Sequence, residues 1–108
     1  MKQNHAVKML SAIAHDGRLS LIRRLIQAGP EGMSAGDIAR FAKSGATTAS
    51  AQLLVLTNAG LVTSERRGRQ VVYSARYDRM RDLLQFLMLD CCAKRPDICV
   101  PVAEAVSA

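Results

Sequence analysis

The chain has 108 residues, of which 49% are hydrophobic and 22% are charged. It is therefore long enough for one domain with a modest core, and too apolar to be disordered throughout. Its 15 Lys and Arg residues against 9 Asp and Glu give a net charge of +6, and eleven of the fifteen cations are arginine. A small basic domain rich in arginine favours a polyanionic partner, with nucleic acid ahead of a membrane surface.

Several classes of protein are disfavoured by what the chain lacks. No apolar run approaches the ~18 residues of a transmembrane helix, and the first residues are amphipathic, unlike a secretion signal. Three cysteines cannot all pair within one chain, which favours a reducing, cytoplasmic environment. The sequence has no Gly-rich phosphate loop, no Ser/His/Asp arrangement and no C-x-x-C pair. We therefore expect neither an enzyme nor a membrane protein.

Two helices are predicted at the start of the chain, over residues 6–14 and 18–28. Val7, Leu10 and Ala14 share one face of the first helix. The Gly-Pro-Glu-Gly run that follows the second helix stops it. The second helix has its apolar residues on two adjacent stripes, which contain Leu19, Ile22 and Ile26, and Leu21 and Leu25.

A pair of shorter helices follows. Ser34 stands three residues before Asp37, which resembles a capping box and predicts a short helix through residue 42. A further helix is predicted over residues 46–59, with Gly60 as its terminator.

The last part of the chain changes period and then returns to helix. Residues 61–66 and 70–76 are short runs with three Val, a Thr and a Tyr, and they predict a β-hairpin with the basic tip Arg67-Gly68-Arg69. Residues 79–92 have helical spacing but are apolar on more than one face, so this helix needs a second partner, for which a subunit interface is the natural candidate. Its apolar residues are Met80, Leu83, Leu84, Phe86, Leu87, Met88, Leu89 and Cys91.

This order of elements describes a winged helix-turn-helix, in which a basic hairpin follows two helices joined by a turn. Three stretches then resemble the ArsR/SmtB family of bacterial metalloregulators. Residues 14–19 (AHDGRL) resemble the start of that family's second helix, residues 48–62 its recognition helix and strand entry, and residues 66–73 its wing. The resemblance implies a mainly α protein with a small β-hairpin, dimeric through its first and last helices. It also implies a repressor that binds double-stranded operator DNA and releases it on binding an inducer.

The family's known sensing sites narrow the choice of inducer. Its zinc sensors carry acidic and His ligands on the last helix, where this chain has no His. Other members carry a cysteine pair on the short helix before the recognition helix, and residues 34–42 contain no cysteine. What remains is Cys91-Cys92 with Cys99, which resembles the arsenic-sensing branch and implies trivalent arsenic or antimony as inducer. We accordingly divide the chain into a DNA-binding and dimerisation domain, 1–92, and a tail, 93–108, that completes the cysteine site.

The chemistry of the three thiols agrees with that implication. All three cysteines fall within nine residues, and three soft sulfur donors without a fourth ligand do not complete the tetrahedral site of structural zinc, so no structural metal is expected. Lys94 and Arg95 favour the thiolate form. We prefer this interpretation to a buried Cys91 with two incidental thiols. A thiol-oxidation sensor and a small carrier of soft metals remain as alternatives.

The predicted DNA contacts fall into two groups. Residues 66–81 carry six arginines against one aspartate, a local charge of +5. The three arginines of the hairpin tip, Arg66, Arg67 and Arg69, are expected to contact phosphates. Residues 44–62 contain no charged residue, so base reading would fall to short polar groups at the exposed start of the helix, where Gln suits adenine and the Thr methyl suits thymine. These groups are Thr47, Thr48, Ser50 and Gln52.

Overall fold

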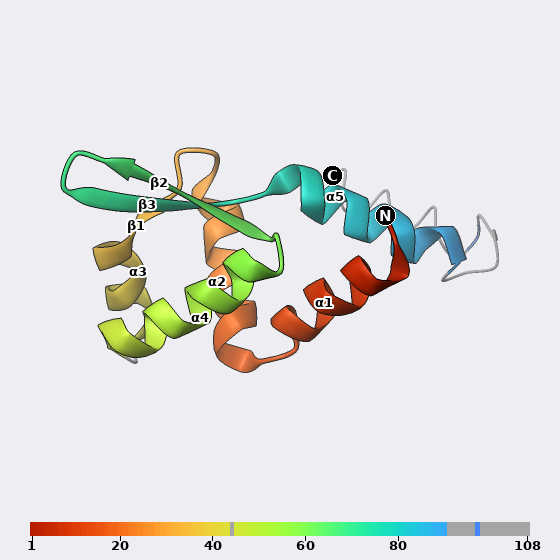
Figure 1. The fold of residues 1–108 in the computed structure, drawn as a ribbon, viewed down its shortest axis with the longest axis horizontal. Helices are drawn as coiled ribbons and strands as arrows, with labels where there is room; N and C mark the ends of the chain where they lie inside the picture. The colour runs from red at the N-terminus through yellow and green to blue at the C-terminus, as the bar shows by residue number, and fades with distance from the viewer. Residues whose placement is uncertain (44, 91–96, 98–108) are drawn as a thin grey trace.

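A computed structural model describes residues 1–43, 45–90 and 97, which form five helices and a three-stranded antiparallel sheet (Figure 1). In chain order the elements are α1 (Gln3–Ile13), α2 (Asp16–Ala28), β1 (Met33–Ser34), α3 (Ala35–Ala42), α4 (Ala46–Asn58), β2 (Val62–Arg67), β3 (Gln70–Ala75) and α5 (Tyr77–Asp90). The predicted mainly α fold with a β-hairpin is therefore confirmed. None of the helices in these ranges has the length and apolar character needed to cross a membrane.

The hydrophobic core lies where the helices meet the base of the hairpin. Each large apolar side chain that is fully buried there stabilises the fold by about 1.5–3 kcal/mol relative to an exposed one. These side chains come from four helices and from the entry to β2, and they are Met9, Ile22, Leu25, Ile38, Leu56 and Leu61. Because α1, α2, α3 and α4 all contribute to one core, the position of α4 is fixed from several sides.

Helix α1 is apolar on two faces. Ala6, Met9 and Ala12 are buried in the core, whereas Val7 and Leu10 are 57% and 40% exposed. The apolar spacing noted in the sequence for Val7 and Leu10 therefore belongs to the outer face, and the residues that anchor α1 lie beside it.

Helix α5 shows the same division. It begins at Tyr77, two residues before the predicted start, and the Tyr77 hydroxyl donates a hydrogen bond to the carbonyl oxygen of Ile26 on α2 (3.0 Å). Leu83 is buried, but Leu84 and Leu87 are 49% and 38% exposed. Helices α1 and α5 lie at the end of the molecule opposite the hairpin tip (Figure 1). We call the exposed residues Val7, Leu10, Leu84 and Leu87 the α1–α5 apolar surface.

The sheet contains a strand that the sequence pattern did not predict. The strand order is β1-β3-β2, with Met33 opposite Tyr73 and Ser34 opposite Val72. Gly32, just before β1, has a φ of 75°, and a Cβ there would clash with the carbonyl oxygen of Tyr73, so the close approach of the two strands requires glycine. Two residues are too few to show an alternating pattern, which explains why β1 escaped detection.

Candidate nucleic-acid interface

The connection between α3 and α4 is built from local signals. The Ser34 hydroxyl accepts a hydrogen bond from the backbone N–H of Asp37 (3.2 Å), which confirms the predicted helix start. Helix α3 ends at Ala42 and is followed by Lys43, which has a left-handed backbone (φ 58°), and α4 begins after Gly45 (φ 89°). Ile38 of α3 is fully buried in the core. The turn therefore sets α3 and α4 in the arrangement of a helix-turn-helix.

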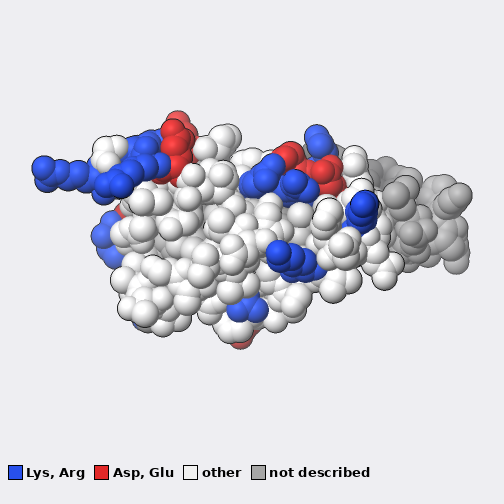
Figure 2. All heavy atoms as spheres, viewed as in Figure 1, with Lys and Arg blue, Asp and Glu red and all other residues white. Residues whose placement is uncertain are grey.

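The two faces of α4 differ in burial. Its inner face buries Ala49, Leu53 and Leu56 in the core. Thr47, Thr48 and Ser50, three of the residues predicted to read bases, are exposed along its first two turns. Helix α4 carries no charged side chain, and the surface over it in Figure 2 is correspondingly white.

Gln52, the fourth predicted base-reading residue, lies on the flank of α4 and not on its outer face. It is half-buried, and its Oε1 accepts a hydrogen bond from Nη1 of Arg18 on α2 (3.2 Å). A Cβ at Gly17 would lie 3.3 Å from Nε2 of Gln52, so the amide packs against the first turn of α2. A base-reading role for Gln52 stays a prediction, and it must operate from this engaged position.

The wing consists of β2, β3 and the turn between them. Arg66, Arg67 and Arg69 are all exposed at its tip, and Figure 2 shows Lys and Arg atoms projecting there beyond the body of the molecule. Arg67 forms an ion pair with Glu65 (3.3 Å), but the two side chains are 53% and 69% exposed. A pair so exposed is weak, so Arg67 remains available to another anion.

These features agree with comparisons to known proteins. A model of a helix-turn-helix domain matches residues 13–65. The structure is similar to an ArsR-like transcriptional regulator from Rhodococcus sp. RHA1 (TM-score 0.70, 21% identity, 79% of this chain and 77% of that chain). No curated protein matches the chain.

Two further structures share more of the sequence. The homodimeric winged helix-turn-helix DNA-binding domain of Mb0332 from Mycobacterium bovis, a possible ArsR-family regulator, is 26% identical (TM-score 0.65, 80% and 78% coverage). The transcriptional repressor BigR from Xylella fastidiosa is 27% identical (TM-score 0.63, 84% and 90% coverage). The chain has a winged helix-turn-helix fold. Its similarity to these proteins extends to structures described as ArsR-like or possible ArsR-family transcriptional regulators.

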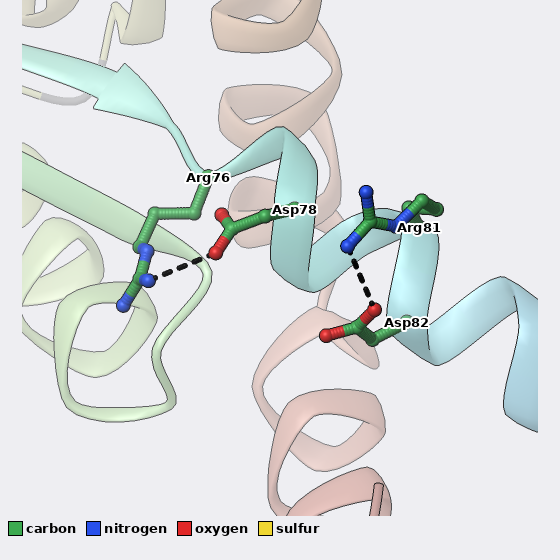
Figure 3. Close-up of polar contacts among 4 residues, drawn as sticks. All are labelled: Arg76, Asp78, Arg81 and Asp82. Carbon is green, nitrogen blue, oxygen red and sulfur yellow. Dashed lines mark hydrogen bonds and ion pairs between the residues drawn. The ribbon is translucent and has the colours of Figure 1, made fainter.

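The arginine-rich stretch of the sequence, residues 66–81, occupies two separate places in the structure. Beyond the wing tip, Arg76 pairs with Asp78 (3.0 Å) and Arg81 with Asp82 (3.3 Å) around the start of α5 (Figure 3). Desolvation raises the pKa of Asp78, but the hydrogen bond and charge of Arg76 and backbone N–H donors outweigh it and hold that pKa below its usual 3.8. The arginines of residues 66–81 therefore do not form a single basic surface.

Further residues of the winged helix were not singled out in the sequence. On the outer face of α4, Ala51 is exposed, and Leu54 and Val55 are 60% and 39% exposed. The sequence contained a signal for Leu54 and Val55, because four consecutive apolar residues at 53–56 are too many for one buried face of a helix. Arg18 gave no such signal, because its contact with Gln52 joins residues 34 positions apart.

The three predicted sulfur ligands, Cys91, Cys92 and Cys99, lie outside the described residues. Within residues 1–43, 45–90 and 97, no group of three or more His, Cys, Asp or Glu side chains is arranged to hold a metal ion.

Proposed function

We propose that the chain is a homodimeric transcriptional repressor. In this proposal it binds double-stranded operator DNA through α4 and the wing, and releases it when trivalent arsenic or antimony binds Cys91, Cys92 and Cys99. The observation that carries the DNA-binding part is the exposed, uncharged outer face of α4 beside an arginine-bearing wing tip (Figure 2).

The two parts of the interface have different tasks. Helix α4 has 13 residues, about 20 Å of length, and fits the major groove, where the hydroxyls of Thr47, Thr48 and Ser50 can reach base edges. Because α4 brings no charge, attraction to phosphates comes from the wing tip. Affinity for any DNA is thus assigned mainly to the wing, and selectivity to α4.

The dimer rests on the α1–α5 apolar surface. Leaving Val7, Leu10, Leu84 and Leu87 exposed on a chain of this size is unfavourable unless a partner covers them. A second copy is the partner that the homodimeric domain of Mb0332 suggests. A two-fold dimer presents two copies of α4 to half-sites about one helical turn of DNA apart.

The inducer site is proposed from the chemistry of its donors. Three thiols can displace the three hydroxyl groups of arsenous acid, with formation of three As–S bonds and release of three water molecules, and no oxidant is required. Arsenic(III) is thiophilic, and three sulfurs satisfy its coordination. Cys91 directly follows α5 in the sequence. An inducer bound there acts on the end of a helix that contributes to the proposed dimer surface. A free-energy coupling of typical size between inducer binding and DNA binding would weaken DNA binding ~5–150-fold.

The test uses a duplex enriched from a random library by the wild-type protein. We expect fluorescence anisotropy to show ~5–150-fold weaker binding in the presence of arsenite. The Cys91→Ser, Cys92→Ser, Cys99→Ser variant should bind the duplex like the wild type and ignore arsenite. Sedimentation should show a dimer at micromolar concentration.

Each competing function gives a different result. Normal release of the triple variant by arsenite would place the inducer site elsewhere, and a monomer that binds the duplex would remove the dimer from the proposal. Release by peroxide but not by arsenite would identify a thiol-oxidation sensor. Tight arsenite binding without enrichment of any duplex would identify a soft-metal carrier.

A further inference from the structure

Arg18 joins three helices of the winged helix domain. It belongs to the first turn of α2 and is half-buried. Its Nε donates a hydrogen bond to the carbonyl oxygen of Ala12 on α1 (2.5 Å), and its Nη1 donates one to Oε1 of Gln52 on α4 (3.2 Å). One guanidinium thus connects the end of α1 to the flank of α4.

The Ala12 carbonyl and the backbone around Arg18 both favour this contact. Ala12 lies in the last turn of α1, where backbone carbonyls lack an intrahelical donor and the helix dipole favours a cation. The Arg18 backbone is itself fixed, because Nδ1 of His15 accepts hydrogen bonds from the N–H groups of Gly17 (3.1 Å) and Arg18 (3.4 Å). The guanidinium therefore starts from a constrained turn and donates to acceptors on two helices through two of its nitrogens, which suits the planar fork of arginine.

We propose that Arg18 is a positioning residue that sets the Gln52 amide and the register of α4 relative to α1. This inference rests on the proposed function of α4 as the recognition helix. Oε1 of Gln52 keeps a second lone pair and Nε2 keeps its two hydrogens, so an amide oriented by Arg18 still has groups to offer an adenine. Since α1 contributes to the α1–α5 apolar surface, the same contact relates the position of α4 to the proposed subunit interface.

The main variant is Arg18→Lys, which keeps the charge and removes the fork. Its matched control is Arg23→Lys, because Arg23 lies on the same helix, is exposed, and makes no ion pair or hydrogen bond within the described residues. Arg18→Met serves as a stronger variant if it folds, as judged by circular dichroism, and Gln52→Ala removes the acceptor.

Three measurements separate positioning from a general loss of stability. Hydrogen exchange of α4 amides in the DNA-free protein should be faster in Arg18→Lys and unchanged in Arg23→Lys. Affinity for the enriched duplex should fall roughly tenfold in Arg18→Lys, as expected for a lost charged hydrogen bond. Selection from a random library should relax at the same base positions for Arg18→Lys and for Gln52→Ala. The double variant Arg18→Lys, Gln52→Ala should bind the enriched duplex with no lower affinity than the poorer-binding of the two single variants.

Two results would overturn the inference. The first is an Arg18→Lys protein that matches Arg23→Lys in α4 exchange and in base preference. The second is a pair of strictly additive losses for Arg18→Lys and Gln52→Ala. If the wild type enriches no duplex, the proposed function fails instead, and α4 exchange alone then decides whether Arg18 positions the helix.

Discussion

The arginines of the wing tip and those around the start of α5 belong to one stretch of sequence but have different surroundings. The wing tip contains Arg66, Arg67 and Arg69, with Glu65 as its acidic neighbour across a solvent-exposed pair. Around the start of α5, Arg76 and Arg81 each have an aspartate partner. Both groups have acidic neighbours in exposed pairs, so position is what separates them. Charge in a sequence window becomes one attractive surface only where the fold keeps its cations together.

The largest effect should follow from removing the wing-tip charge. Replacing Arg66, Arg67 and Arg69 with Gln should weaken binding to any duplex by at least about 100-fold. The slope of log K against log salt should become shallower by about 0.9 per lost phosphate contact. Anisotropy titrations at four salt concentrations measure both quantities. The double variant Arg76→Gln, Arg81→Gln is the control, and an equal loss in that control would show that both groups face DNA.

A single pair of substitutions sharpens the same comparison. Arg67→Ala should weaken binding roughly 5- to 10-fold on enriched and scrambled duplexes alike and reduce the salt slope by about 1 per subunit, because a phosphate contact carries no sequence information. Arg76→Ala should change affinity by less than about twofold, because Arg76 directly follows β3, at the end of the hairpin opposite its tip. A loss confined to the enriched duplex would instead assign Arg67 to base reading.

The smallest effect concerns the Asp78–Arg76 pair and its pH dependence. The pKa of Asp78 lies below its usual 3.8 in the folded chain, so the ionised pair stabilises the fold above that pH, and this contribution disappears as the pH falls through the lowered value. Asp78 also lies in the first turn of α5, where a negative charge is favourable.

Asp78→Asn should therefore unfold at a slightly lower temperature than the wild type at pH 7, as measured by thermal melts. The difference should vanish in strong acid. A difference that persists unchanged to pH 2 would assign the effect to packing and not to charge.

The elements of the DNA-binding region were predictable because their signals are local. The Ser34 cap three residues before Asp37, the terminator Gly60 and the change of period into the hairpin each act over a few residues, and the structure contains each of the elements they predicted. Strand β1 was missed because its pairing partner, β3, lies about forty residues further along the chain. The engaged state of Gln52 was missed for the same reason, because Arg18 is distant in sequence.

The sequence by itself determined the order of the helices and strands, the basic tip of the hairpin and the absence of charge on α4, because backbone propensity, capping and charge are properties of neighbouring residues. Only the tertiary structure decided which apolar face of α1 enters the core, which arginines meet an aspartate and which group Gln52 contacts. Those outcomes depend on side chains that packing brings together from distant parts of the chain, and a hydrogen bond or an ion pair forms only when its two groups come within about 3 Å to 4 Å of each other.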